Sequence, residues 1–142
     1  MNNLKRAKEL VNRFKPKMEI AIRNTFKDGK ERSFFIFDDS GTVSTTPMRV
    51  GSDFSINSPH DSQLVKEMKE LPGGDNVIIV DFHTHPEGDS PVYPSDDDRR
   101  HAIRIRSMMS CIGTILNPED PPIVDCWTID EETGRIRKIL SF

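Results

Sequence analysis

Two histidines in the second half of the chain are placed to bind a metal ion. His83 and His85 follow a short apolar segment, residues 76–82, that is predicted to be a strand covered on both faces. Because side chains two residues apart in a strand point to the same side, both imidazoles can reach one ion. Neutral imidazole suits zinc, and on ligand type also copper, iron or nickel. Two histidines leave such a site incomplete, so a third ligand must come from another segment.

Helical periodicity indicates which carboxylate completes the site. Ser95 is a good N-cap for a helix that begins with the three acidic residues 96–98, as the helix dipole favours. Steps of four, three and four residues from Asp98 reach Ala102, Ile105 and Met109, an apolar face that must be buried. The same steps from the other two aspartates reach mixed or polar faces. We therefore expect Asp98 to be the third ligand, leaving a fourth position for water as in catalytic zinc sites.

A hydrolase built on this site also needs a base and a hydrogen-bond donor. Glu31 stands just before the apolar run Phe34–Phe37, and Glu19 lies in the first helical region. Either carboxylate is a candidate to take a proton from the attacking water. Ser95, three residues before Asp98, could place a hydroxyl beside the metal and stabilise the oxyanion of a tetrahedral intermediate.

Together these residues resemble the JAB/MPN family of zinc metallopeptidases, the JAMM proteases. The family motif is an upstream glutamate, then H-[S/T]-H-P, a short loop and S-x-x-D, matched here by Glu31, HTHP at 83–86 and SDDD at 95–98. The resemblance implies Zn²⁺ as cofactor, with His83, His85 and Asp98 as ligands. It also implies Glu31 rather than Glu19 as general base, since the family order is helix, glutamate, strand, and oxyanion support from Ser95. The loop PEGDSPVYP before Ser95 is two residues longer than usual in the family.

The elements around the motif predict one α/β or α+β domain with a mixed β-sheet flanked by helices. A chain of 142 residues fits a single domain over 1–142, with an N-terminal helical region at 1–27 and a core at 31–142. Pro16 is expected to end or kink a first helix over 4–14, with a second helical stretch reaching about residue 26. The resemblance narrows the fold to the JAB/MPN, cytidine deaminase-like, architecture. We expect further helices at 58–71 and after 95, and strands at 33–37, 42–46, 76–82, 111–116, 123–129 and 135–140.

Composition and charge restrict the cellular location and the binding partners that we expect. The net charge of −3 and a pI near 5.8 argue against a nucleic-acid partner. The sequence has no apolar run of the roughly 20 residues that a membrane-spanning helix requires, and its first residues lack the apolar region of a signal peptide. Two cysteines, Cys111 and Cys126, are too few for a disulfide framework. We therefore expect a cytoplasmic protein without membrane contact.

Three functions are compatible with these patterns. The resemblance implies a zinc metallopeptidase that hydrolyses isopeptide or peptide bonds at the C-terminal tail of a ubiquitin-like modifier or its conjugate. The alternative is a non-catalytic JAB scaffold, or a protein like the RadC-type branch, which HPEGD followed by PS resembles, binding a protein or DNA partner. The run Asp81-Phe82-His83-Thr84-His85 also resembles the D-x-H-x-H of amidohydrolase and PHP-type metal sites. Those motifs open a large barrel, and a barrel of about 250 residues does not fit this chain.

Overall fold

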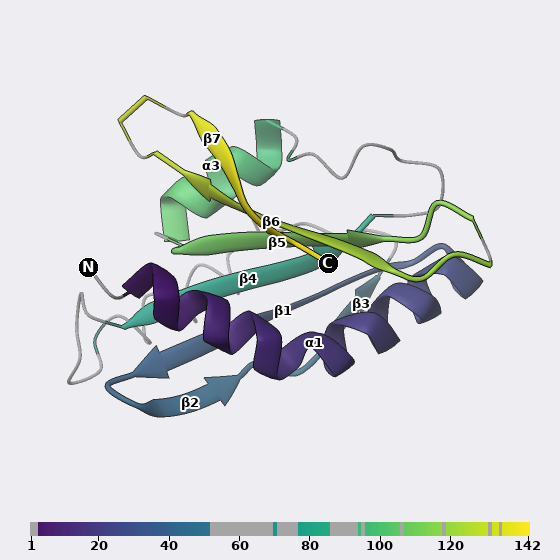
Figure 1. Cartoon of the computed structure of the whole chain (residues 1–142), viewed down its shortest axis with the longest axis horizontal. Coiled ribbons are helices and arrows are strands. Elements are labelled where there is room, and N and C mark those ends of the chain that lie inside the picture. Colours follow the sequence, from purple (N-terminus) through teal and green to yellow (C-terminus); the bar gives the residue numbers. More distant parts are fainter. Residues whose placement is uncertain are drawn as a thin grey trace.

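The computed structural model describes residues 3–51, 77–85, 96–105, 107–117, 119–130 and 135–142, together with 70, 94, 132 and 133. Within them, two helices accompany one mixed sheet of seven strands (Figure 1). The predicted fold class is therefore confirmed. The helices are α1 (Asn3–Asp28) and α3 (Asp96–Ile105), and the strands are β1 (Glu31–Asp39), β2 (Thr42–Thr45), β3 (Arg49–Gly51), β4 (Ile78–Thr84), β5 (Met109–Thr114), β6 (Ile123–Ile129) and β7 (Ile136–Ser141).

Strand β4 lies at the centre of the sheet. The strand order is β2-β1-β4-β5-β6-β7, and β3 pairs with β1 beside β2. β4 is antiparallel to β1 and parallel to β5, whereas the other paired strands are antiparallel. Parallel neighbours need a crossover connection, and α3 lies within the one that joins β4 to β5. The topology therefore carries α3 past the carboxyl end of β4.

The two faces of β4 have different neighbours. Ile78, Val80 and Phe82 belong to the main hydrophobic core, which α1 covers with its apolar stripe. Ile79 and Asp81 alternate with them and so point to the opposite face. Every residue of β4 is buried, as the continuous apolar run of the sequence predicts.

Pro16 was predicted to end or kink the helix, and the first of these alternatives is wrong, because α1 continues through it. A proline inside a helix removes one backbone hydrogen bond and crowds the preceding turn. Burial of the residues on both sides outweighs that cost. Val11 and Met18 are both fully buried against the sheet, one on each side of the exposed proline. Packing of the apolar stripe of α1 against the sheet therefore outweighs the tendency of proline to end a helix.

Most predicted strands are present with shifted ends. β1 begins at Glu31 rather than Ser33, and β4 extends two residues beyond its predicted end to include His83 and Thr84. The short strand β3 was not predicted. The helix predicted at 58–71 lies outside the described residues. Among the described residues, no helix combines the length and the apolar character that a membrane crossing requires.

Gly113 in β5 allows α1 to approach the sheet closely. A Cβ atom at this position would lie 2.6 Å from Cγ1 of Ile22 on α1, closer still to its Cδ1, and 3.2 Å from a ring carbon of Phe82. Ile22 is itself buried and has little room to move. The close contact between α1 and the sheet thus depends on glycine at position 113, because any side chain there would meet Ile22.

We predict that Gly113→Ala lowers the free energy of unfolding by about 1–3 kcal/mol, because the added methyl overpacks the contact with Ile22. Ile22→Ala creates a cavity at the same place, so the added cost of Gly113→Ala should fall towards zero in that background. Urea unfolding followed by Trp127 fluorescence measures all four proteins. An equal cost in both backgrounds would contradict the close contact.

Candidate metal centre

The carboxyl end of β4 presents both histidines on one side of the sheet. In the register of the sheet, His83 lies opposite Ser33 of β1 and beside Ile112 of β5. The pairing with β5 continues beyond the strand, because the backbone N–H of His85 donates to the carbonyl oxygen of Gly113 at 2.9 Å. Held extended in this way, the two side chains point to the same face, as the sequence predicts.

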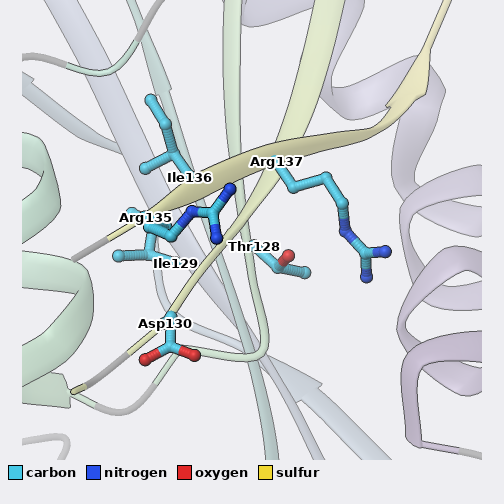
Figure 2. Close-up of a pocket in the computed structure, with 6 residues that line it drawn as sticks. All are labelled: Thr128, Ile129, Asp130, Arg135, Ile136 and Arg137. Atoms are coloured by element: carbon cyan, nitrogen blue, oxygen red, sulfur yellow. The ribbon is translucent and has the colours of Figure 1, made fainter. Parts of the chain in front are cut away.

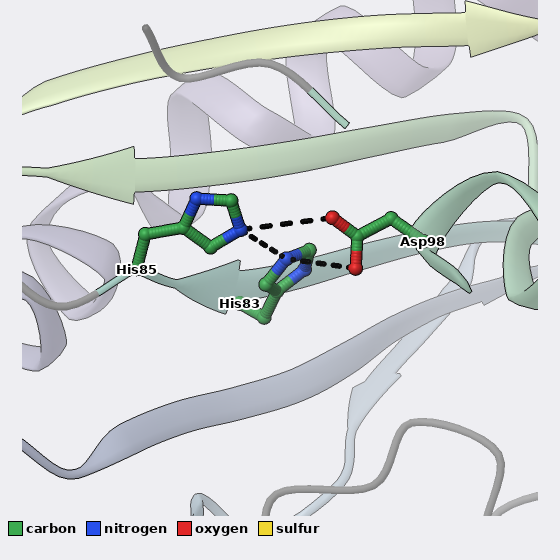
Figure 3. A group of neighbouring side chains, drawn as sticks. All are labelled: His83, His85 and Asp98. Carbon is green, nitrogen blue, oxygen red and sulfur yellow. Dashed lines mark hydrogen bonds and ion pairs between the residues drawn. The ribbon is translucent and has the colours of Figure 1, made fainter. Parts of the chain in front are cut away.

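Asp98 of α3 completes a group of three potential ligands with these histidines (Figure 3). The two Nε2 atoms are 3.2 Å apart. One carboxylate oxygen of Asp98 lies 3.4 Å from Nε2 of His83, and the other lies 3.6 Å from Nε2 of His85. Tetrahedral zinc, with bonds of about 2.0–2.1 Å, separates its ligand atoms by about 3.3 Å. Imidazole and carboxylate are ligands that zinc accepts, and the group could hold a metal ion.

The surroundings of the group are negatively charged and only partly open to solvent. The side chain of His83 is 4% exposed, whereas those of His85 and Asp98 are 17% and 11% exposed. Burial lowers the pKa of His83, but the hydrogen bond and charge of Asp98 and the charges of Asp81 and Glu31 outweigh it, so the pKa lies above its ordinary value. Three carboxylates around one imidazole favour a bound cation.

Thr84 lies between the two histidines, and its side chain points to the opposite face of the sheet, where it connects the end of β4 to α1. Its Oγ1 lies 2.7 Å from Oγ1 of Thr25 on α1, and it accepts a hydrogen bond from the backbone N–H of Arg32 at 2.9 Å. Arg32 in turn binds both carboxylate oxygens of Asp28 at the end of α1. This network anchors the backbone that carries the histidines to α1 and to the start of β1. It was not identified from the sequence, since its partners lie far apart along the chain.

The structure separates the two candidates for a general base. Glu31 is two residues from Ser33, which pairs with His83, so its side chain shares the face of the histidines, and its charge acts on His83. Glu19 lies on α1, which packs against the other face. Glu31 is therefore brought to the metal group and Glu19 is not. The catalytic role of Glu31 stays a prediction, and Ser95 lies outside the described residues.

Asp81 has a different position from the one that a D-x-H-x-H metal site requires. Its Oδ1 accepts hydrogen bonds from Ser107 at 2.5 Å and from Ser110 at 2.7 Å. The carboxylate is buried among these hydroxyl groups, and the metal group consists of the two histidines and Asp98. The sequence did contain a signal for this network, because a buried aspartate in a central strand requires hydrogen-bond donors.

A separate pocket lies at the hairpin of β6 and β7 (Figure 2). Its volume is about 490 Å³. It is lined by Thr128, Ile129, Asp130, Arg135, Ile136 and Arg137. None of these residues belongs to the metal group, so the pocket and the metal group are distinct features.

Comparison with known proteins identifies the family. A family model described as prokaryotic homologs of the JAB domain matches residues 19–130. The chain belongs to this family. The match spans Glu31, both histidines and Asp98, and the helix-and-sheet architecture is consistent with the JAB fold, which the resemblance predicted. No match was found among curated proteins.

We predict that the purified JAB domain binds about one zinc ion per chain and that Asp98→Asn weakens this binding strongly. The loss of affinity should exceed the roughly 10- to 100-fold loss that follows from replacing a residue that hydrogen-bonds a metal ligand, because here a ligand itself is removed. Chelator competition with elemental mass spectrometry measures the affinity and the stoichiometry.

Asp96→Asn is the matched control for this experiment. Asp96 lies on the same helix, its side chain is 74% exposed, and it pairs with Arg99 rather than with a histidine. This variant should bind zinc as tightly as the parent. Equal zinc affinity in the parent and in Asp98→Asn would show that Asp98 is not a ligand.

Proposed function

We propose that this JAB domain is a zinc-dependent hydrolase of the JAMM type that cleaves peptide or isopeptide bonds. The observation that carries the proposal is the convergence of His83, His85 and Asp98: the two Nε2 atoms are 3.2 Å apart, and each lies 3.4 or 3.6 Å from a different carboxylate oxygen of Asp98. Membership of the prokaryotic JAB family supports the same chemistry. A ligand set of two histidines and one carboxylate also leaves a coordination position for water, which a structural zinc site does not.

In this proposal the protein supplies the metal ligands and their orientation. Zinc, when bound, polarises a substrate carbonyl and lowers the pKa of a bound water to about 7. His83 is held by its burial in β4, and His85 by its backbone hydrogen bond to β5. Asp98 reaches both from α3. Because these ligands come from two elements, their relative placement decides whether the site is complete.

The proposed proton carrier is Glu31. Its carboxylate would take a proton from the attacking water and deliver it to the leaving amine nitrogen. Its place at the first position of β1, on the face of the histidines, supports this role. The hydroxyl group of Ser95 would donate a hydrogen bond to the oxyanion of the tetrahedral intermediate, as the family motif implies.

The proposed substrate is the C-terminal tail of a ubiquitin-like modifier, joined to a protein through a peptide or isopeptide bond. The resemblance to JAMM proteases supports this substrate class. The alternative, a non-catalytic JAB scaffold or RadC-like protein that binds a protein or DNA partner, requires no metal ligands. The presence of three side chains at ligand spacing therefore favours the hydrolase.

We predict that Glu31→Gln retains zinc but loses hydrolysis by about 10²- to 10⁴-fold, because the amide cannot accept the proton. Turnover is measured with zinc-loaded protein on a panel of ubiquitin-like modifiers that carry a fluorogenic amide at the C-terminus. Glu19→Gln is the control, since Glu19 lies on the helix behind the sheet, and it should keep full activity. Full activity of Glu31→Gln would contradict the assignment of the base.

A further inference from the structure

A buried carboxylate joins the two elements that carry the metal ligands. Asp81 is 6% exposed and lies two residues before His83 on the same face of β4. Its Oδ1 accepts hydrogen bonds from two serine hydroxyls. Ser110 is its direct neighbour in β5, whereas Ser107 lies between the end of α3 and the start of β5. The carboxylate thus connects β4 both to the next strand and to the segment that follows α3.

The segment around Ser107 is closely tied to α3. The backbone N–H of Ser107 donates to the carbonyl oxygen of Ala102 at 3.0 Å, which closes the last turn of the helix. The next backbone N–H, of Met108, donates to the carbonyl oxygen of Ile79 on β4 at 2.7 Å. Ala102 is buried and lies four residues after Asp98, on the same side of the helix. Ser107 is therefore connected, through the last turn of α3, to the side of the helix that carries Asp98.

The carboxylate is the strongest acceptor within reach of the Ser107 hydroxyl. That oxygen lies 2.5 Å from Oδ1 of Asp81, 2.9 Å from the carbonyl oxygen of Met109 and 3.4 Å from that of Ile79. A hydroxyl has one proton to donate, and hydrogen bonds to a charged acceptor are shorter and stronger than those to a neutral one. The donor therefore points to Asp81, and this bond fixes the end of α3 against β4.

We propose that Asp81 is a positioning residue that acts through Ser107 to set the distance between Asp98 and His83, and thereby the affinity for the metal. The inference rests on the proposed metal site. Asp81 lies outside the three-residue metal group, and its Oδ1 accepts hydrogen bonds from two hydroxyls. Residues that hydrogen-bond a metal ligand directly typically change metal affinity by 10- to 100-fold when replaced, and Asp81 acts less directly, so we expect an effect of about 10-fold.

The test compares two variants that each remove one hydrogen bond from the same carboxylate oxygen. Ser107→Ala removes the bond that holds the end of α3 to Asp81, so its zinc affinity should fall about 10-fold, the lower end of the range for residues that orient metal ligands. Ser110→Ala removes a bond between strands that the β4–β5 ladder already holds, so its zinc affinity should stay within about threefold of the parent. Ser107→Thr keeps the hydroxyl and should restore most of the affinity. Chelator competition measures zinc binding, and urea unfolding of the zinc-free proteins checks that each variant is folded.

A second buried carboxylate provides the matched control. Asp125 of β6 is 7% exposed and accepts a hydrogen bond from Ser141 of β7 at 2.5 Å. Ser141→Ala removes a bond of the same kind between β6 and β7, which does not involve the segment that follows α3, so stability should fall without a change in zinc affinity. A similar loss of affinity in this control, or in Ser110→Ala, would show a general structural effect and overturn the positioning role.

The remaining outcomes separate the two proposals. If the parent binds zinc and Ser107→Ala binds it equally well, the positioning role is wrong while the metal site stands. If the parent binds no zinc, the metal site is wrong, and the positioning role falls with it. Should Ser107→Ala fail to fold, Ser107→Cys keeps a side chain of similar size with a much weaker donor and is expected to show the same loss of affinity.

Discussion

The burial of β4 on both faces is the constraint on which the rest of the structure depends. Each polar side chain in such a strand must find a partner inside the protein, because an unpaired polar group away from water is costly. Asp81 meets hydroxyls next to α3 and on β5, His83 meets Asp98 on α3, and Thr84 meets Thr25 on α1. These three polar residues thus specify how the neighbouring elements are placed against an otherwise apolar strand.

The parallel pairing of β4 with β5 determines where Asp98 lies. β4 and β5 run in the same direction, so the chain must leave the carboxyl end of β4 and return to the opposite end of the sheet before β5 begins. α3 lies on this return path and carries Asp98 past the histidines. On the other side of β4, β1 is antiparallel, so its amino end, with Glu31, lies beside the carboxyl end of β4 that carries the histidines.

Features set by local periodicity could be predicted from the sequence, and features set by contacts between distant segments could not. The pairing of His83 with Asp98 follows from one strand alternation and one helical face, both readable within a few residues. Pro16 was expected to end or kink a helix because local preference ignores the sheet that α1 covers. The bond between Asp81 and Ser107 spans 26 residues, and no pattern within either segment indicates the other. The same holds for the short strand β3, which exists through its pairing with β1.

The choice between the two glutamates shows how packing on one face determines chemistry on the other. Composition and spacing left both open, whereas the family order favoured Glu31. In the structure, Glu19 lies on α1 behind the sheet, and the register between β1 and β4 places Glu31 on the face of the histidines. That register is held by the contact of Phe34 with Phe82, whose ring centroids are 5.3 Å apart, and by the hydrogen bond from Arg32 to Thr84. A slip of one residue would move every side chain of β1 to the opposite face and take Glu31 away from the histidines. The aromatic core under α1 therefore helps to place Glu31 on the face of the metal group.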